Sequence, residues 1–260
     1  MMRSLWTAAS GMVAQQLNID VSANNLANVN TFGFKKSRAE FQDLMYQTLR
    51  IAGAEDQAGN TTPTGMQVGM GVRPGSVHKF FKQGDFQNTG NPLDLAIQGD
   101  GFFQVDDNGT LAYTRSGAFK LNSDGVIVTA EGYPLQPSVT VPPETESISV
   151  SNDGIISAVD RNGTVLASVD LDVFTFVNPA GLNSVGGNRY LETEASGAAT
   201  PVTPGQDNAG SIAQGFLEMS NVEIVEEMVN LIIGQRAYES NSKAISTADQ
   251  MLGMVNRMAR

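Results

Sequence analysis

Large apolar residues recur every seven positions near the start of the chain. They are Leu5, Met12, Ile19 and Leu26, and small or polar residues fill most positions between them. A seven-residue repeat is typical of the face that one helix presents to a partner helix. The pattern predicts a helix over residues 4–28, about 37 Å long. We expect it to end near Asn30-Thr31-Phe32-Gly33, where Asn, Thr and Gly follow one another.

The same spacing returns at the other end of the chain. Its members are Leu231, Tyr238, Ile245, Leu252 and Ala259, with Val255 on an adjoining position. Ser220-Asn221-Val222-Glu223 is typical of a helix start, and acidic residues in the first turn with arginines in the last favour the helix dipole. The pattern predicts a second helix over residues 221–258.

These two helices have two possible interpretations. They could be core elements of an ordinary helical bundle, but an enclosed helix usually shows apolar residues at about three positions in seven. Here the flanks of each apolar row are largely Gln, Asn, Ser and Ala. This narrow row favours coiled-coil pairing and close packing between subunits. Helices at opposite ends of one chain also invite antiparallel pairing with each other.

The middle of the chain has the pattern of β-hairpins. Turn sequences occur at Asp107-Asn108-Gly109, Ser123-Asp124-Gly125, Asn152-Asp153-Gly154 and Arg161-Asn162-Gly163. Runs of strand-forming residues flank them, for example at 125–130, 147–150, 164–169 and 171–177. Stretches rich in Pro, Gly, Ser and Thr at 53–75 and 196–210 are predicted connectors.

The expected fold is therefore α+β, with the terminal helices paired as a coiled-coil domain and a β-rich, hairpin- or barrel-like domain inserted between them. Residues 1–35 and 217–260 would form a helical polymerisation domain. Residues 36–84 and 205–216 would form an extended connector, and residues 85–204 a β-rich outer domain.

Charge is concentrated in the middle of the chain. Residues 51–216 hold 7 of the 16 basic and 18 of the 27 acidic residues, so this part carries the whole net charge of -11. An acidic middle repels phosphate backbones, so we expect neither nucleic acid nor an anionic membrane as a partner. No apolar run is long enough to span a bilayer, so no membrane insertion is expected.

Residues that could carry chemistry are sparse. The chain has no cysteine and a single histidine, His78, which stands beside Lys79 in a predicted strand. Gly69-Met70-Gly71 and Gly99-Asp100-Gly101 lack the rest of a nucleotide-binding motif. Asp106-Asp107-Asn108-Gly109 resembles a calcium loop only in part, and an Asx turn explains it. We therefore expect no enzyme, no cofactor and no catalytic or metal-binding residue.

Several motifs resemble those of the bacterial flagellar rod and hook proteins. They are Ala23-Asn24-Asn25-Leu26-Ala27-Asn28-Val29-Asn30-Thr31-Phe32-Gly33-Phe34-Lys35, Gly99-Asp100-Gly101-Phe102-Phe103, Tyr113-Thr114-Arg115-Ser116-Gly117-Ala118-Phe119, Leu217-Glu218-Met219-Ser220-Asn221-Val222 and Gln235-Arg236-Ala237-Tyr238-Glu239-Ser240-Asn241-Ser242-Lys243. Hook proteins are considerably longer and the smaller proximal-rod proteins lack most of the β domain. Length therefore narrows the resemblance to the distal rod or its near-equal proximal neighbour.

The resemblance implies a structural subunit of the distal rod, a rigid hollow drive shaft that transmits motor torque to the hook. It implies self-assembly into a helical homo-oligomer, with proximal rod proteins, hook protein, the P-ring and L-ring bushing and the flagellar export apparatus as partners. The expected location is the periplasmic rod of the basal body, reached without a cleaved signal peptide. The predicted polymerisation residues are Leu5, Met12, Ile19, Asn24, Asn25, Leu26, Asn28, Leu231, Tyr238, Ile245, Leu252 and Val255. For the three asparagines, local termination of the helix is an equal alternative.

One segment is predicted to stiffen the assembly. Met66, Val68, Met70 and Val72 alternate and would present one apolar face in a gap between neighbouring subunits, within a stretch that also holds Pro63 and Gly65. The alternatives to a distal-rod protein are a proximal-rod or hook-type axial protein, a secreted β-rich enzyme and a surface adhesin.

Overall fold

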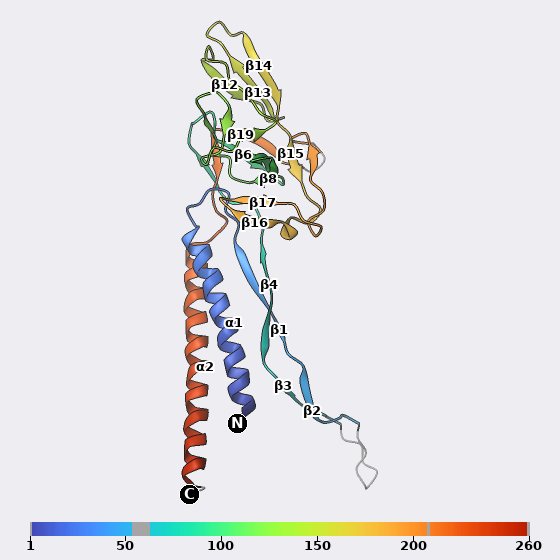
Figure 1. Cartoon of the computed structure of the whole chain (residues 1–260), viewed down its shortest axis with the longest axis vertical. Coiled ribbons are helices and arrows are strands. Elements are labelled where there is room, and N and C mark those ends of the chain that lie inside the picture. Colours follow the sequence, from blue (N-terminus) through green and yellow to red (C-terminus); the bar gives the residue numbers. More distant parts are fainter. Residues whose placement is uncertain (1, 54–62, 207–208, 259–260) are drawn as a thin grey trace. The chain divides into compact units, whose positions relative to one another are not determined.

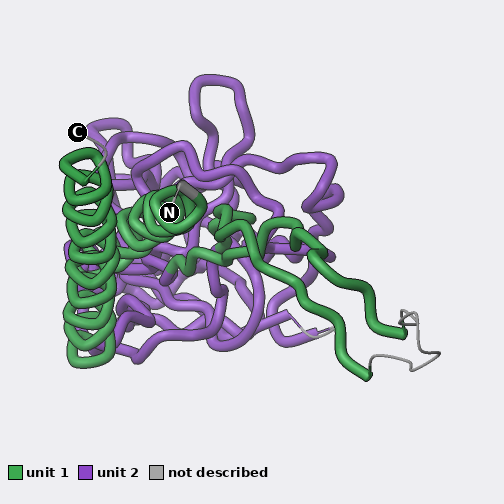
Figure 2. Tube along the Cα trace, turned by 90° about the horizontal axis from the view of Figure 1, so that it is seen from below, with its two compact units in different colours: residues 1–26, 37–78, 224–260 green, residues 27–36, 79–223 purple. Residues whose placement is uncertain are grey.

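The computed structural model describes residues 2–53, 63–206 and 209–258. The chain divides into two compact units (Figure 2). Unit 1 comprises residues 1–26, 37–78 and 224–260, and unit 2 comprises residues 27–36 and 79–223. Unit 1 therefore joins the two ends of the sequence with a part of the predicted connector.

The two predicted terminal helices are present in unit 1 (Figure 1). Helix α1 spans Met2–Ala27 and helix α2 spans Ile224–Met258. Helix α2 begins three residues later than the predicted residue 221, and the Asn221 side chain instead makes hydrogen bonds with other segments. Glu226 and Glu227 lie in its first turn and Arg257 in its last, as the dipole favours.

The two helices lie antiparallel where they touch. A Cβ atom on Gly11 would stand 2.9 Å from Asn241 Nδ2, and one on Gly234 would stand 2.9 Å from Ile19 Cγ1. From the first contact to the second, the residue number rises from 11 to 19 in α1 and falls from 241 to 234 in α2, so the helices are antiparallel. The missing side chains let the two helices approach closely. Two glycines lie in this contact, and at Gly234 the facing residue is Ile19 of the predicted heptad row.

The rest of unit 1 is a pair of two-stranded ladders. Their strands are β1 (Ser37–Asp43), β2 (Tyr46–Arg50), β3 (Met66–Gly69) and β4 (Val72–Lys79, whose last residue belongs to unit 2). Strand β1 pairs with β4, and β2 pairs antiparallel with β3. The predicted connector thus contains paired strands. They were not predicted, because Pro and Gly in this stretch are typical of loops.

Unit 2 is built almost wholly of short strands. They are β5 (Phe86–Asn88), β6 (Leu95–Gln98), β7 (Phe103–Asp107), β8 (Thr110–Thr114), β9 (Lys120–Leu121), β10 (Ile127–Val128), β11 (Leu135–Gln136), β12 (Ser147–Val150), β13 (Ile155–Val159), β14 (Val165–Asp170), β15 (Val173–Thr175), β16 (Asn183–Gly186), β17 (Arg189–Leu191), β18 (Thr200–Val202), β19 (Ser211–Gln214) and β20 (Phe216–Glu218), with the short 3₁₀ helix η1 (Pro179–Gly181). The largest sheet has five strands in the order β11-β7-β8-β17-β16, and β12-β13-β14 form a three-stranded sheet. In the part of unit 2 that the structure describes, no sheet closes into a barrel.

All four predicted hairpin turns are confirmed. They connect β7 to β8, β9 to β10, β12 to β13 and β13 to β14, and each of these pairs is antiparallel. Gly154 shows why the turns need glycine: its φ is 88°, and a Cβ there would lie 2.4 Å from the Leu171 carbonyl oxygen. At the first turn, the Asp106 carboxylate accepts a hydrogen bond at 2.6 Å from Gly109 N, three residues further along the chain, so the aspartate side chain closes this turn.

Unit 2 has two hydrophobic clusters. The larger gathers aliphatic and aromatic residues from β6, β7, β13 and β19, including Ile97, Phe103, Ile156 and Ile212. The smaller is aromatic and is formed by Phe102, Tyr113 and Tyr190, with Phe81 and others packed on it. Ring pairs there meet edge to face, as between Phe81 and Tyr190 with centroids 5.4 Å apart. These clusters give unit 2 a core of its own.

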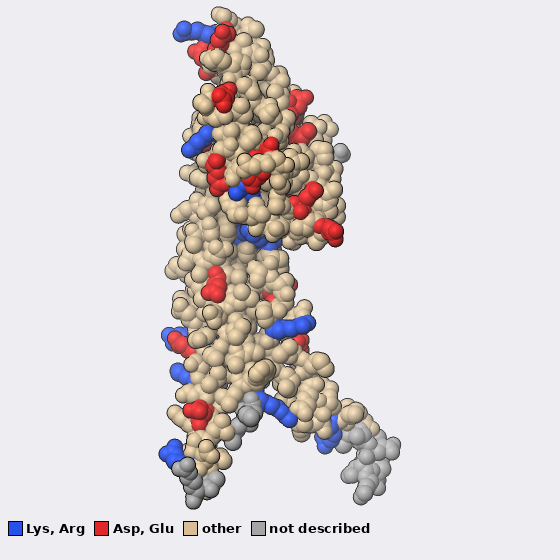
Figure 3. All heavy atoms as spheres, in the orientation of Figure 1, with Lys and Arg blue, Asp and Glu red and all other residues tan. Residues whose placement is uncertain are grey.

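Most of the acidic charge falls in unit 2. It holds 18 of the 27 acidic and 8 of the 16 basic residues. On the face shown in Figure 3, acidic side chains are scattered over the β-rich unit and do not gather in one patch. Among the described residues, neither helix is long and apolar enough to cross a bilayer, and no three potential ligands gather to hold a metal ion.

Candidate functional site: assembly surfaces and a buried polar cluster

The first turns of α2 leave a row of large apolar side chains in solvent. Their exposed fractions are 49% for Ile224, 74% for Val225, 48% for Met228, 48% for Val229, 56% for Ile232 and 59% for Ile233. Six neighbouring apolar side chains, each between 48% and 74% exposed, form a contiguous apolar surface, which is typical of a contact with another protein. We call these six residues the α2 face. The heptad pattern did not single them out.

The predicted heptad residues of α2 lie beside this face. Leu231, Ile245 and Leu252 are half-buried, whereas Tyr238 and Val255 are 40% and 47% exposed. The fully buried positions of α2 are Glu227, Gly234 and Ala248, which also differ by multiples of seven. The intramolecular contact thus follows a neighbouring row of the same helix and leaves part of each predicted side chain accessible.

Helix α1 shows the same division. The predicted residues Leu5, Met12, Ile19 and Leu26 are half-buried, while the fully buried positions are the small or polar Ala8, Ala14, Ser22 and Asn25. Trp6 and Val13 are 67% and 60% exposed. Both helices therefore expose large apolar side chains in the isolated chain.

The three asparagines at the end of α1 differ in their surroundings. Asn25 is buried, its amide donates to Ser37 O at 2.8 Å, and its Oδ1 accepts from Ser37 N at 2.9 Å. Asn28 accepts a hydrogen bond from the Thr31 hydroxyl at 3.2 Å, and Asn24 is exposed. Asn25 and Asn28 thus make local hydrogen bonds where the helix ends. A role in register between subunits stays a prediction.

The hairpin of β2 and β3 is a second exposed apolar surface, which we call the arm (residues 45–51 and 65–69). The exposed fractions are 86% for Met45, 54% for Tyr46, 51% for Leu49, 71% for Ile51, 52% for Met66 and 37% for Val68. Of the predicted stiffening segment, Pro63 and Gly65 are exposed, Met66 and Val68 lie in β3, and Met70 and Val72 are half-buried. Residues 54–62, which belong to the same predicted connector, lie outside the described residues.

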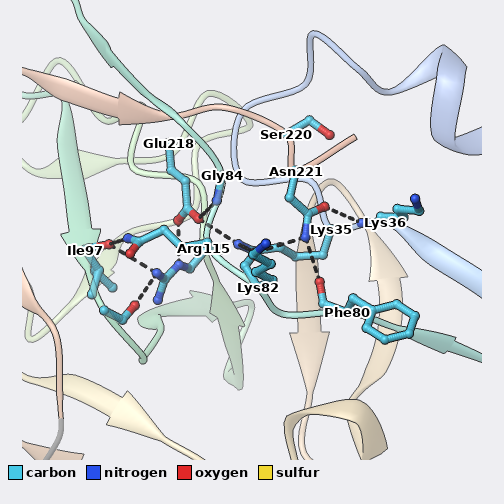
Figure 4. Close-up of polar contacts among 12 residues, drawn as sticks. Lys35, Lys36, Phe80, Lys82, Gly84, Ile97, Arg115, Glu218, Ser220 and Asn221 are labelled. Carbon is cyan, nitrogen blue, oxygen red and sulfur yellow. Dashed lines mark hydrogen bonds and ion pairs between the residues drawn. The ribbon is translucent and has the colours of Figure 1, made fainter. Parts of the chain in front are cut away.

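Unit 2 contains a buried cluster of three charged side chains (Figure 4). Glu218 Oε1 lies 2.6 Å from Lys35 Nζ, and Glu218 Oε2 lies 2.6 Å from Arg115 Nε. The side chains of Lys35, Glu218 and Arg115 are exposed by 1%, 1% and 4%. A charge so deeply buried is tolerable only if it is paired and hydrogen-bonded.

Backbone groups complete this polar cluster. Lys35 Nζ donates to Lys82 O at 2.8 Å, and Gly84 N donates to Glu218 Oε1 at 3.0 Å. The Arg115 guanidinium donates to the carbonyl oxygens of Ile97 in β6 and of Gly99 and Gly101 in the loop between β6 and β7. The three charged groups therefore join their own segments to residues 82–84 and 97–101.

Burial lowers the pKa of Lys35. Removal from water lowers the pKa of the Lys35 ammonium below its usual value of 10.5, and the adjacent Glu218 carboxylate offsets part of that shift. Arg115 adds to the lowering through like-charge repulsion. The cluster therefore contains one carboxylate, Glu218, that is paired with two cations, Lys35 and Arg115, away from solvent.

Asn221 joins the same region through its side-chain amide (Figure 4). Its Oδ1 accepts a hydrogen bond from Lys36 N at 2.7 Å. Its Nδ2 donates to Phe80 O and to Lys82 O, both at 2.9 Å. All three contacts are to backbone groups, so one side chain fastens the start of the α2 segment to two other parts of unit 2.

The polar cluster was not predicted from the sequence. Lys35, Arg115, Glu218 and Asn221 all stand inside the motifs that resemble flagellar proteins, but those motifs lie far apart in the chain. The sequence shows these residues within short motifs, but it does not show which residues they pair with. The lone His78 has its Nδ1 3.7 Å from Glu40 Oε1 on the neighbouring strand.

Comparison with known families covers both ends and the middle of the chain. Residues 5–35 match a flagella basal body rod protein model, residues 96–158 match the flagellar hook protein FlgE/F/G D1 domain, and residues 213–258 match the flagellar basal body rod FlgEFG protein C-terminal model. The fold and these matches define the class: a flagellar axial protein of the rod and hook type.

Full-length relatives identify the family within this class. The chain is 48% identical to the flagellar basal-body rod protein FlgG of Borreliella burgdorferi, with 100% of both chains covered. It is 48% identical to FlgG of Caulobacter vibrioides with 99% of both covered, and 40% identical to FlgG of Bacillus subtilis with 97% of both covered. The chain belongs to the family of flagellar basal-body rod protein FlgG, and it is a structural subunit of the flagellar distal rod.

Proposed function

We propose that the chain polymerises through its terminal helices into a rigid, hollow, helical shaft that passes motor torque to the hook. The observation that carries the proposal is the α2 face, where six large apolar side chains are each between 48% and 74% exposed. Burying such a surface against another copy would gain roughly 25 cal/mol per Å² of apolar area. The exposed Trp6 and Val13 of α1 would add to the same contact.

The predicted polymerisation residues fit this proposal. Leu5, Met12, Ile19, Leu26, Leu231, Ile245 and Leu252 are half-buried, so each keeps accessible surface for a neighbouring copy. Coiled-coil packing of the helices in the shaft would follow from these heptad rows. A contact between copies that joins two different surfaces of the chain would continue as an open helix and not stop at a dimer.

The arm would stiffen the shaft by occupying gaps between copies. Its large apolar side chains on β2 and β3 are exposed, and a two-stranded hairpin has little stability in water by itself. Contact with neighbouring copies would cover these side chains and oppose sliding of one subunit past another.

The partners proposed for the shaft follow from the family. They are other copies of the chain, the proximal rod proteins, the hook protein, the P-ring and L-ring bushing and the export apparatus. The proposed location is the periplasmic rod of the basal body. The acidic surface of unit 2 supports protein partners and disfavours nucleic acid.

Electron microscopy of the concentrated, purified chain tests the proposal. We expect straight tubes from the wild type and from Ser240→Asp, because Ser240 is a polar exposed residue of α2. Val225→Asp should abolish the tubes without changing the circular dichroism of the chain, because it places a carboxylate in the α2 face. Tubes formed by Val225→Asp as readily as by the control would contradict the proposed surface.

A further inference from the structure

The backbone passes between the two units at four places. These crossings follow Leu26, Lys36, His78 and Glu223. If the chain works as a rod subunit, which is the function proposed above, force that reaches its helices is passed along the covalent backbone at these crossings. How the four segments are fastened inside unit 2 then decides whether they share that force.

Inside unit 2, the second and third crossings are joined directly. Phe80 N donates a hydrogen bond to Lys36 O at 2.9 Å. Lys36 directly precedes the second crossing, and Phe80 is the second residue after the third. Lys79 Nζ also lies 5.2 Å from the ring centroids of both Phe34 and Tyr190, so the ammonium sits between two aromatic rings.

The fourth crossing is joined to these two by Asn221. Its amide binds Lys36 N on one side and the carbonyl oxygens of Phe80 and Lys82 on the other. An amide is suited to this arrangement because it accepts with its oxygen and donates with both hydrogens. A carboxylate in its place could make only the contact with Lys36.

The loop between the first and second crossings is fastened by Glu218. Gly33 N donates to Glu218 O at 2.8 Å, and Lys35 pairs with the Glu218 carboxylate. Gly33 has a φ of 71°, and a Cβ there would lie 2.6 Å from Ser116 N, so the loop packs closely against the bend after β8 that carries Arg115.

In unit 1, the residues next to the crossings are also joined to one another. Asn25 and Ser37 exchange two hydrogen bonds, which closes the loop of residues 27–36 at its base. Strand β1 begins at Ser37 and pairs with β4, which ends at the third crossing.

We propose that Asn221 and the Lys35–Glu218–Arg115 cluster form a clamp that makes the crossing segments share force inside unit 2. Segments that are joined by one hydrogen-bonded network carry an applied force together. A segment that is held alone loses its hydrogen bonds one after another. Buried hydrogen bonds in a network also strengthen one another. Asn221 is the positioning residue of the clamp, because it contacts three backbone groups from two segments other than its own.

The chain offers a matched control in Gln214. Its amide also makes three hydrogen bonds to backbone groups of unit 2: it accepts from Val150 N at 3.1 Å and donates to Pro92 O and Ile148 O, both at 2.8 Å. None of these groups lies within the segments that adjoin the crossings. Asn221→Ala and Gln214→Ala therefore remove the same number of amide contacts from one unit, but only the first opens the clamp.

Single-molecule pulling on the full-length chain tests the proposal. The chain has no cysteine, so Ala27→Cys and Glu223→Cys, both at exposed positions beside crossings, provide two clean attachment points. At constant force between these points, we expect Asn221→Ala to unfold unit 2 about tenfold faster than the wild type, as expected when hydrogen bonds of this kind are lost. Gln214→Ala should unfold close to the wild-type rate.

A second measurement separates the clamp from the function it serves. In cells that lack their own copy, Asn221→Ala should form rods in wild-type number but stop rotating at a load that wild type and Gln214→Ala sustain. Equal unfolding rates under force for the two variants would overturn the clamp, even if Asn221→Ala formed no rods. Failure of the wild-type chain itself to form rods would instead contradict the proposed function and leave the pulling result unaffected.

Discussion

Lys35 and Glu218 are 183 positions apart in the chain, yet their charged groups meet at 2.6 Å with both side chains 1% exposed. One residue follows the end of α1 and the other precedes the start of α2. The ion pair therefore holds together, within unit 2, the two segments that lead to the terminal helices. Because the pair is buried, removing either residue would leave the other charge in the interior without this partner and lower the free energy of unfolding.

Removing the Lys35 charge should destabilise unit 2. Lys35→Met retains most of the apolar stem but leaves Glu218 with Arg115 alone, so we expect the free energy of unfolding to fall by about 3 kcal/mol. Urea titration followed by circular dichroism would measure the change. A matched control is Glu40→Gln in the exposed pair with Arg38, whose charged atoms are 3.2 Å apart and whose side chains are 58% and 49% exposed. The control should change stability little, and equal losses for both variants would refute the importance of burial.

The titration of Lys35 should make stability depend on pH. Its pKa is lowered in the folded chain from 10.5, chiefly by burial and despite the Glu218 carboxylate. Between the folded-state pKa and 10.5, the unfolded chain binds more protons at this site than the folded chain, so the Lys35 contribution to stability rises with pH in that window. It is constant below the folded-state pKa, where both states carry the proton.

Two measurements check this sign. The free energy of unfolding of the wild type, relative to that of Lys35→Met, should increase as pH approaches 10. Side-chain NMR of labelled lysines should show Lys35 losing its proton below the usual pKa of 10.5. A Lys35 signal that titrates at or above 10.5 would contradict the assigned environment.

The apolar side of the arm should control straightness of the assembled shaft. Met66 and Val68 are two residues apart on β3 and so lie on one face of the strand, while Gln67 lies on the other. Met66→Ser combined with Val68→Ser should still allow polymerisation but yield tubes that bend more. The persistence length in electron micrographs is the readout, and Gln67→Ser is the control. Unchanged straightness in the double variant would rule out stiffening by this face.

The sequence predicted the parts of the fold that short-range patterns determine. The two terminal helices follow from seven-residue repeats, and all four hairpins follow from turns in which Asx and Gly stand between strand-forming runs. The ladders of β1 with β4 and β2 with β3 were not predicted. Their partners are separated by about 15 to 30 residues of Pro- and Gly-rich chain, and nothing local specifies such pairing.

The contacts that join distant segments lay beyond the sequence pattern. Arg115 could have been an exposed strand residue, because its burial depends on Glu218, which is 103 positions away. The α2 face was missed for a different reason: the heptad row drew attention to Leu231 and Ile245, whereas Val225 and Ile232 stand outside that row and are more exposed. Exposure is a property of the folded chain and cannot be read from spacing alone.

The central claim is that the α2 face is buried between copies in the rod. Because the chain has no cysteine, Ile232→Cys provides a single thiol on that face, where Ile232 is 56% exposed. Leu111→Cys, at a residue of β8 that is 50% exposed, reports on unit 2 for comparison. The decisive measurement is the rate of maleimide labelling at residue 232 in the isolated chain and in assembled rods. We predict fast labelling in the isolated chain and strong protection in rods, and equal labelling in both states would contradict the account.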